Sequence, residues 1–493
     1  MDHKKTPYFT ALKEYAEKDI NPLDVPGHKR GRIKNDLTDA LGDSVFLYDV
    51  NAPKGLDNLS RPQSVIKEAQ NLMADAFNAD KAYFLLNGTT QGIITMILTV
   101  VRAHEKIILP RNTHKSIISG LILSGAIPIF LPTIIDEELG ISNGFTIDNL
   151  IKTIDENPDA KAVFVINTTY FGACTDLKSV VDIAHDNNML VLVDEAHGSH
   201  LSFNDKLPIG AMEAGADMSS ASFHKTLGSL TQTSVLLAKG NRVDYNRIRV
   251  VINILQSTSP SSIMLASLDV ARKQMYFNGK KELDAVIELS EYAKEKINKI
   301  PGIKLIDKNY FKTKGTFDYD QTKLLISIAD LGKPGYWFYN VLRDRFDIQL
   351  ELAETYVILA ILAIGTIKKD IDRLVDALAI LSSELYDGNK KLPFPKFRYH
   401  FPTMQVRPRV AFHAPKKFVS INDAIGEISG ESIMIYPPGI PIVIPGEIID
   451  INVVDMINFY FENGFSILTE QEDDTVKVVD QENWSKEYDE DDL

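Results

Sequence analysis

Short apolar runs alternate with amphipathic stretches over most of the first 300 residues. Runs of this kind, which predict buried strands, lie at 82–86, 106–109, 128–131, 162–166 and 191–193. The stretches between them that show helical spacing of apolar side chains lie at 66–77, 93–101, 146–155 and 176–187. Alternation at this spacing predicts an α/β fold with a mostly parallel sheet and crossover helices.

The pattern changes after the helix predicted at 263–276. A charged helix is expected at 282–299, followed by a smaller α/β unit with strands at 304–307, 323–328, 348–352 and 356–364 and helices at 337–346 and 367–385. The proline- and base-rich stretch 386–410 is interpreted as a linker, and the proline-rich run 436–449 predicts a tightly turning loop.

Four parts are therefore expected along the chain. They are an N-terminal arm (1–50), a large ligand-binding domain (51–300), a small α/β domain (301–390) and a C-terminal domain with an acidic tail (391–493).

Composition narrows the class of protein. The 493 residues are 44% hydrophobic and carry a formal net charge of −14, which disfavours nucleic acid or an anionic membrane as a partner. The longest apolar run, 357–364, is too short to span a bilayer. The single cysteine, Cys174, excludes a disulfide framework and a multi-cysteine metal site, and no metal is expected. The N-terminal residues lack an apolar signal region, so a cytoplasmic protein is expected.

Polar residues follow four of the predicted strands where each strand ends. They are Asn87, Arg111, Asn167 and Asp194. Ligands of open α/β sheets bind at the carboxyl ends of strands, so the sequence predicts a site formed by these ends.

Asp194 and Lys225 are the strongest candidates for chemistry. Asp194 ends a buried strand, and Lys225 follows about thirty residues later among Ser222, His224 and Thr226. A lysine in such surroundings can be a Schiff-base nucleophile, and the aspartate can pair with a pyridine nitrogen, which together suggest pyridoxal phosphate (PLP). The alternative is an ordinary strand-end aspartate with an unrelated lysine.

Three further stretches carry weaker signals. The turn Gly88-Thr89-Thr90 offers backbone N–H groups and two hydroxyls before a predicted helix, which suits a phosphate. His114 follows a strand end, where an imidazole could lie flat on an aromatic cofactor, although a loop histidine is more often merely hydrogen-bonded. Thr258 and Ser259 precede the helix at 263–276, and the simpler interpretation is that one of them caps it.

The chain contains eight motifs in this order: DVPGHKRG, NGTTQG, PRNTHKS, INTTYFG, VLVDEAHG, SFHKTLGSLTQ, STSP and YPPGIPIVIPGE. This set resembles the Orn/Lys/Arg decarboxylase family, and the resemblance covers nearly the whole chain. It implies PLP fold type I (aspartate-aminotransferase-like), with a large domain, a smaller α/β domain and a C-terminal α+β unit. The length and the DEAHG sequence resemble the short biosynthetic branch, typified by arginine decarboxylases of Gram-positive bacteria.

The resemblance also implies roles for individual residues. Lys225 would hold the cofactor and Asp194 would pair with its pyridine nitrogen, while His114 and Ala196 would contact the two faces of the ring. His197 would lie beside Asp194 on the substrate side, and its role is left open. The residues that would bind the phosphate are Gly88, Thr89, Thr90, Ser222 and His224, joined by Thr258 or Ser259 of a neighbouring subunit. Sites shared in this way would make a homodimer, or a higher homo-oligomer, obligatory.

The implied activity is decarboxylation of a basic amino acid. Arginine, giving agmatine, is preferred over lysine, giving cadaverine, or ornithine, giving putrescine. Aminotransferases of this fold hold the substrate carboxylate with an arginine of the small domain, but no arginine lies between Arg345 and Arg373. Two other classes are considered: an α-oxoamine synthase, and a non-catalytic PLP-fold regulator, which would be expected to lack Lys225 or Asp194.

Glu447 is the candidate for binding the distal cation of the substrate. A carboxylate can grip a guanidinium with two hydrogen bonds, which an ammonium does not allow. The alternative interpretation of Glu447 is an exposed loop residue, and Asp24 and Glu354 are weaker candidates for the same role.

Overall fold

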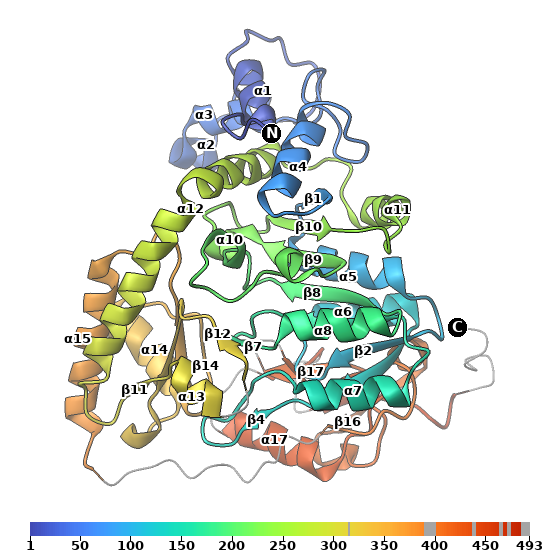
Figure 1. Ribbon diagram of the computed structural model, residues 1–493, viewed down its shortest axis with the longest axis vertical. Helices are drawn as coiled ribbons and strands as arrows, with labels where there is room; N and C mark the ends of the chain where they lie inside the picture. Colours follow the sequence, from blue (N-terminus) through green and yellow to red (C-terminus); the bar gives the residue numbers. More distant parts are fainter. Residues whose placement is uncertain (314–315, 389–400, 436–439, 463–466, 471–474, 485–493) are drawn as a thin grey trace. The chain divides into compact units, whose positions relative to one another are not determined.

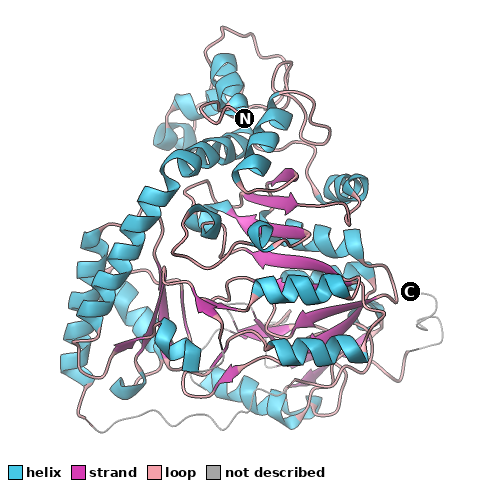
Figure 2. Ribbon diagram, viewed as in Figure 1, coloured by secondary structure: helices cyan, strands magenta, loops and turns pink. Residues whose placement is uncertain are grey.

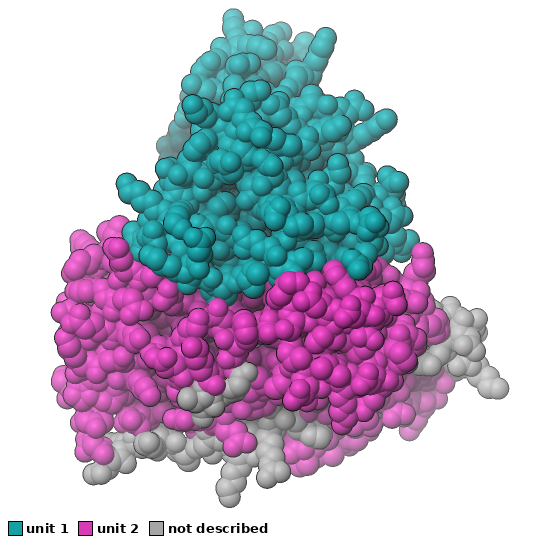
Figure 3. All heavy atoms as spheres, viewed as in Figure 1, with its two compact units in different colours: residues 1–99, 192–285, 363–365 teal, residues 100–191, 286–362, 366–493 magenta. Residues whose placement is uncertain are grey.

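The structure is a computed structural model that describes residues 1–313, 316–388, 401–435, 440–462, 467–470 and 475–484 (Figure 1). The chain divides into two compact units (Figure 3). Unit 1 contains residues 1–99, 192–285 and 363–365, and unit 2 contains residues 100–191, 286–362 and 366–493. Helices and strands contribute to both (Figure 2). The four predicted domains are not these two units, and their boundaries stay a prediction.

Unit 1 is built around strands in the order β1-β10-β9-β8. Their bounds are Lys81–Leu85 (β1), Leu190–Glu195 (β8), Met218–Ser222 (β9) and Ser234–Ala238 (β10). β8 and β9 are parallel, with Glu195 opposite Ala221, whereas β9 pairs antiparallel with β10 and places Ser222 opposite Ser234. Every residue of β9 and β10 is buried, as their unbroken runs of small and apolar residues require.

The helices of unit 1 include an anchored N-terminal arm. Their bounds are Pro7–Ala16 (α1), Asp36–Leu41 (α2), Asp43–Tyr48 (α3), Val65–Ala76 (α4), Gly88–Val100 (α5), Ala211–Ala214 (α9), Phe223–Thr226 (α10) and Tyr245–Leu255 (α11). The amides of Tyr8 and Phe9 at the start of α1 donate to the buried carboxylate of Asp269, at 3.0 and 3.3 Å. This carboxylate satisfies amides that have no partner within the helix.

One helix runs through the break that the sequence predicted at 277–281. This helix, α12 (Ser262–Ile297), is a single element of 36 residues. A Cβ on Gly279 would lie 3.1 Å from Cβ of Phe203, so glycine permits a close approach inside the helix here. The amide of Met264 donates to Ser261 Oγ at 3.4 Å. The capping interpretation of Thr258 and Ser259 is therefore wrong.

Unit 2 contains three parallel strands in the order β6-β2-β3. They are Lys106–Pro110 (β2), Ile127–Leu131 (β3) and Ala162–Ile166 (β6), and the accompanying helices are Lys115–Ser124 (α6), Ile147–Glu156 (α7) and Leu177–Asp186 (α8). The predicted strands and helices of this stretch are confirmed to within a residue at most bounds. Short strands Ile135–Asp136 (β4), Ile141–Ser142 (β5) and Ala173–Cys174 (β7) complete this stretch.

The predicted small α/β unit is an antiparallel sheet in the order β11-β13-β15-β14, with helices on it. The bounds are Lys304–Leu305 (β11), Lys308–Thr313 (α13), Asp318–Tyr319 (β12), Lys323–Ser327 (β13), Gly335–Phe346 (α14), Leu352–Ala353 (β14), Val357–Ile361 (β15) and Lys368–Leu385 (α15). Leu324, Ile326 and Ile358 of the sheet form a buried cluster with apolar residues of α14 and α15.

The C-terminal part is α+β, as the resemblance implied. Its elements are Pro408–His413 (α16), Lys416–Ser420 (β16), Ile433–Ile435 (β17), Ile440–Val443 (β18), Ile451–Glu462 (α17), Ile467–Leu468 (β19) and Thr475–Val479 (β20). β16 pairs with β20, and β17 pairs with both β18 and β19. The predicted loop 436–449 thus contains a strand, while residues 436–439 and the acidic tail from 485 lie outside the described residues.

Candidate active site

Lys225 and His197 meet just beyond the ends of two neighbouring strands of unit 1. Their Nζ and Nε2 atoms are 2.9 Å apart. His197 follows β8 by two residues, and Lys225 lies in α10, directly after β9. Because β8 and β9 are parallel and in register, residues that follow their ends are brought together. The predicted lysine thus has a buried histidine as a hydrogen-bond partner.

Asp194 is a buried carboxylate at the end of β8. Its side chain is 5% exposed, and Oδ1 accepts a 2.9 Å hydrogen bond from the amide of Ala196. Burial raises the pKa of Asp194, while this hydrogen bond and the charge of Lys225 act in the opposite direction. A buried carboxylate of this kind is stabilised by a cation, which the protonated pyridine nitrogen of PLP would supply. This site therefore fits the predicted cofactor.

Three hydroxyl groups cluster beside the predicted phosphate turn. Thr89 Oγ1 lies 2.6 Å from Ser222 Oγ and 2.5 Å from Ser234 Oγ, and all three side chains are buried. Thr89 and Ser222 were predicted from the sequence, whereas Ser234 was not. Ser234 is identified by the antiparallel pairing of β9 with β10, whose register places Ser234 opposite Ser222.

The helix of the phosphate turn begins earlier than predicted. α5 starts at Gly88 instead of residue 93, so Thr89 and Thr90 belong to its first turn. The amide of Gly88, whose φ is +68°, donates to the carbonyl of Gln232 at 2.8 Å. First-turn amides and the positive end of the helix dipole favour an anion at this position. The turn thus has the geometry that the sequence predicted for phosphate.

His224 is fixed by the segment that follows α10. Its Nδ1 donates to the carbonyl of Thr233 at 2.9 Å, which orients the ring. Ser199 Oγ, which donates to the carbonyl of Ser222 at 2.8 Å and lies 2.7 Å from Thr226 Oγ1, supports the same stretch of chain.

His114 belongs to unit 2, where it caps α6. Its Nδ1 accepts from the amide of Ser116 at 3.2 Å and lies 2.9 Å from Ser116 Oγ. Because Nδ1 accepts the amide proton, the neutral ring carries its own proton on Nε2. The cap thus orients the ring, and its predicted contact with the cofactor stays a prediction.

Thr258 and Ser259 are exposed in this chain. They lie in the segment between α11 and α12, where the amide of Ser259 donates to Ser257 Oγ at 3.1 Å. Their predicted role across a subunit boundary stays a prediction.

Glu447 is neither an exposed loop residue nor open to a substrate in this chain. Its side chain is buried and forms a two-fold ion pair with Arg111: Nε to Oε1 is 3.0 Å and Nη2 to Oε2 is 2.7 Å. Oε2 also accepts from the amide of Ile444 at 2.9 Å. Both carboxylate oxygens are therefore already bonded, and the structure does not support the prediction that Glu447 binds the substrate cation. Arg111 was predicted as a strand-end residue, but its pairing with Glu447 was not predicted.

The two weaker candidates for the cation differ from each other. Glu354 is 6% exposed, and burial raises its pKa to about 8. Asp24 is exposed on the N-terminal arm. Neither observation brings these residues to the site of Lys225.

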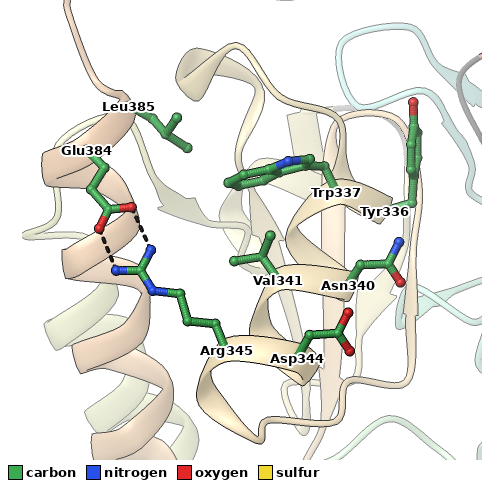
Figure 4. A pocket seen from close by; sticks show the side chains of 8 residues that line it. All are labelled: Tyr336, Trp337, Asn340, Val341, Asp344, Arg345, Glu384 and Leu385. Atoms are coloured by element: carbon green, nitrogen blue, oxygen red, sulfur yellow. Dashed lines mark hydrogen bonds and ion pairs between the residues drawn. The ribbon is translucent and has the colours of Figure 1, made fainter.

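Unit 2 contains a cavity that holds none of the predicted site residues. Its volume is about 620 Å³, and it is lined by Tyr336, Trp337, Asn340, Val341, Asp344, Arg345, Glu384 and Leu385 (Figure 4). Arg345 forms a two-fold ion pair with Glu384, at 2.8 and 2.6 Å, across its edge. Among the residues that the structure describes, no cluster of histidine, cysteine and acidic side chains is suited to a metal. Within the same residues, no helix is both long and apolar enough to cross a membrane.

Two models of one protein family match this chain. The model for the Orn/Lys/Arg decarboxylase major domain matches residues 6–370, and that for the C-terminal domain of the same family matches residues 394–464. The chain belongs to the Orn/Lys/Arg decarboxylase family. The predicted family is thus confirmed, and the chain is a PLP-dependent decarboxylase.

Individual members of the family are similar over nearly their whole length. The arginine decarboxylase of Halalkalibacterium halodurans is 42% identical, covering 97% of this chain and 97% of the relative. The arginine decarboxylase of Bacillus subtilis is 39% identical, covering 97% of this chain and 98% of the relative. Among solved structures, a lysine decarboxylase of Francisella novicida aligns with a TM-score of 0.83 and 21% identity, covering 96% of this chain and 81% of that one. This last likeness confirms the predicted fold.

Proposed function

We propose that this protein converts arginine to agmatine and CO₂. The observation that carries the proposal is the 42% identity to an arginine decarboxylase over 97% of both chains. Similarity of this extent covers the candidate active site and both family domains. Lysine is the alternative substrate, because lysine decarboxylases share the fold, but the lysine decarboxylase of Francisella novicida is only 21% identical to this chain.

The residues of unit 1 would hold the cofactor at three places. Lys225 would bind it covalently through Nζ, and Asp194 would pair with the ring nitrogen. The hydroxyls of Thr89 and Ser222, together with the first turn of α5 (Gly88, Thr89 and Thr90) and His224, would bind the phosphate. Ala196 and His114 would contact the faces of the ring. Bound PLP withdraws electrons from Cα of an amino acid and so stabilises the negative charge left when CO₂ departs.

Proton transfer would fall to Lys225 and His197. Asp194 would keep the ring nitrogen protonated, since an anionic carboxylate favours the charged form of its partner. The 2.9 Å contact between Lys225 Nζ and His197 Nε2 allows one group to take a proton as the other releases it. Lys225 would return the proton to Cα, and His197 would reset its protonation state.

A cytoplasmic homodimer, or a larger assembly of dimers, completes the proposal. Thr258 and Ser259 are exposed in the single chain, and a partner subunit's phosphate site would give them a ligand. Val250 and Ile254 of α11 are 58% and 73% exposed, which is unusual for large apolar side chains and suits a subunit contact.

Product analysis tests the function directly. Purified, PLP-loaded protein would be offered arginine, lysine and ornithine separately, with CO₂ and the amine product measured for each. Agmatine from arginine, with little product from the others, is the expected result. Cadaverine or putrescine as the main product would overturn the substrate, and absence of CO₂ from a cofactor-loaded enzyme would overturn decarboxylation.

A further inference from the structure

The short loop between β2 and α6 connects a buried arginine to the histidine that caps α6. Arg111 directly follows β2, and His114 comes three residues later. Between them, Thr113 is fully buried and Asn112 is 9% exposed. A loop this short and this buried cannot take up a displacement of Arg111 without moving its neighbours.

Arg111 is bound on several sides by the C-terminal part of unit 2. Besides its two bonds to the carboxylate of Glu447, Nη1 donates to the carbonyl of Pro441 at 3.0 Å and Nη2 to that of Ile442 at 3.3 Å. The guanidinium also lies 5.5 Å from the ring centroid of Phe130 on β3. The planar fork of arginine permits all these contacts at once, which lysine would not.

The other end of α6 is held by the same part of the chain. Arg407 donates to the carbonyl of Gly125, the C-cap of α6, at 3.0 Å. Arg409 donates to the carbonyl of Leu123 at 3.0 Å. The C-terminal part therefore contacts α6 at its end and the loop that leads into it, and the Arg111–Glu447 pair is the ion pair among these contacts, with both side chains buried.

We propose that the Arg111–Glu447 pair is a positioning device, which fixes the β2–α6 loop and thereby the orientation of the His114 ring. The inference rests on the proposed role of His114. Stability alone is a poor reason for such a pair, because a buried ion pair contributes little net free energy compared with apolar residues of similar size. Geometric precision of a loop that carries a site residue is a better reason.

The chain offers a matched control for the pair. Arg345 and Glu384 form the same two-fold ion pair at similar distances (Figure 4), but their side chains are 50% and 42% exposed. Glu384→Gln therefore removes an equivalent charge without disturbing the β2–α6 loop. Glu447→Gln keeps the size of the side chain, but its NH₂ group would face donors, the guanidinium of Arg111 or the amide of Ile444.

The experiment measures cofactor binding in the full-length chain. The dissociation constant of PLP and the visible circular dichroism of the bound cofactor would be compared for wild type, Glu447→Gln, His114→Ala and the double variant. We expect Glu447→Gln to weaken PLP binding about tenfold and to change the dichroism, with Glu384→Gln unchanged. In the His114→Ala background, Glu447→Gln should cause little further loss, because both changes act through the same ring.

Other results would overturn the proposal. Equal losses from Glu447→Gln with and without His114 would show a general structural role, as would a lower thermal midpoint with unchanged PLP affinity and dichroism. A raised KM of Glu447→Gln for the amino acid, with normal PLP binding, would instead support the prediction that Glu447 binds the substrate cation. Should Glu447→Gln not fold, Arg111→Lys is the second variant, since it keeps the charge but loses the fork. PLP binding is measured without substrate, so these results are independent of which amino acid the enzyme decarboxylates.

Discussion

His197 Nε2 lies 2.9 Å from Lys225 Nζ, and the two residues belong to segments that follow neighbouring parallel strands. A lysine must lose its proton to act as a nucleophile, and an imidazole nitrogen can accept one. The contact therefore joins the proposed nucleophile to a group that can exchange a proton with it. Asp194, near the end of the strand that His197 follows, adds a carboxyl group to this site.

Replacement of His197 should change proton transfer more than cofactor binding. We expect His197→Gln, which can hydrogen-bond but not titrate, to lower kcat by about 10²-fold or more and to remove or shift one limb of its pH profile. PLP affinity should change little. His413→Gln, on an exposed residue, is the control. An unchanged pH profile would show that His197 merely fills space beside Lys225.

Removal of the charge of Asp194 tests the electrostatics of the ring site. Asp194→Asn keeps the shape but leaves the ring nitrogen without an anion, so we expect kcat at saturating PLP to fall by about 10²–10³-fold. Steady-state kinetics with each variant loaded with cofactor give the comparison. Asp205→Asn is the control, because that carboxylate is 90% exposed and paired with Lys280. A decrease of less than about threefold would contradict the assignment.

Gly92 permits the close approach of α5 to β9. A Cβ at this position would lie 1.9 Å from Ser220 Oγ and 2.8 Å from Ser220 Cβ. Gly92→Ala should therefore lower the free energy of unfolding by about 1–3 kcal/mol, despite the better helix propensity of alanine. Urea unfolding measures the difference. Gly27→Ala, where nothing lies within 4 Å of the added Cβ, should have little effect, and equal stability of both variants would refute the argument.

The sequence predicted the parts of the site that local pattern determines. Apolar runs predicted β1, β2, β3, β6 and β8, and a polar strand end identified Asp194. Lys225 was identified from its serine, histidine and threonine neighbours, whereas β9 and β10 were not predicted. The start of α5 was placed too late because Thr89 and Thr90 have low helix propensity, which packing against β9 outweighs. The contact of Arg111 with Glu447 spans 336 residues, and no local spacing contains such information.

Two other differences have the same origin. The break expected before residue 282 reflects a change in the pattern of the sequence, but the helix continues through Gly279, where an added Cβ would lie 3.1 Å from Cβ of Phe203, a residue 76 positions earlier. Ser234 joined the hydroxyl cluster only once the register of β9 and β10 was known. In each case a long-range contact determines what the local sequence leaves open.

Glu354 should make the stability of the protein depend on pH. Burial raises its pKa from 4.5 to about 8, so between these values the folded protein holds a proton that the unfolded chain has released. The free energy of unfolding then decreases as pH rises, by up to about 1.4 kcal/mol for each pH unit in this range. Glu354→Gln removes the dependence, and its advantage over wild type should be small at pH 5 and grow towards pH 8. Urea unfolding across this range measures the advantage, with Glu384→Gln as the exposed control; an advantage that is constant with pH would show that Glu354 does not titrate as its burial requires.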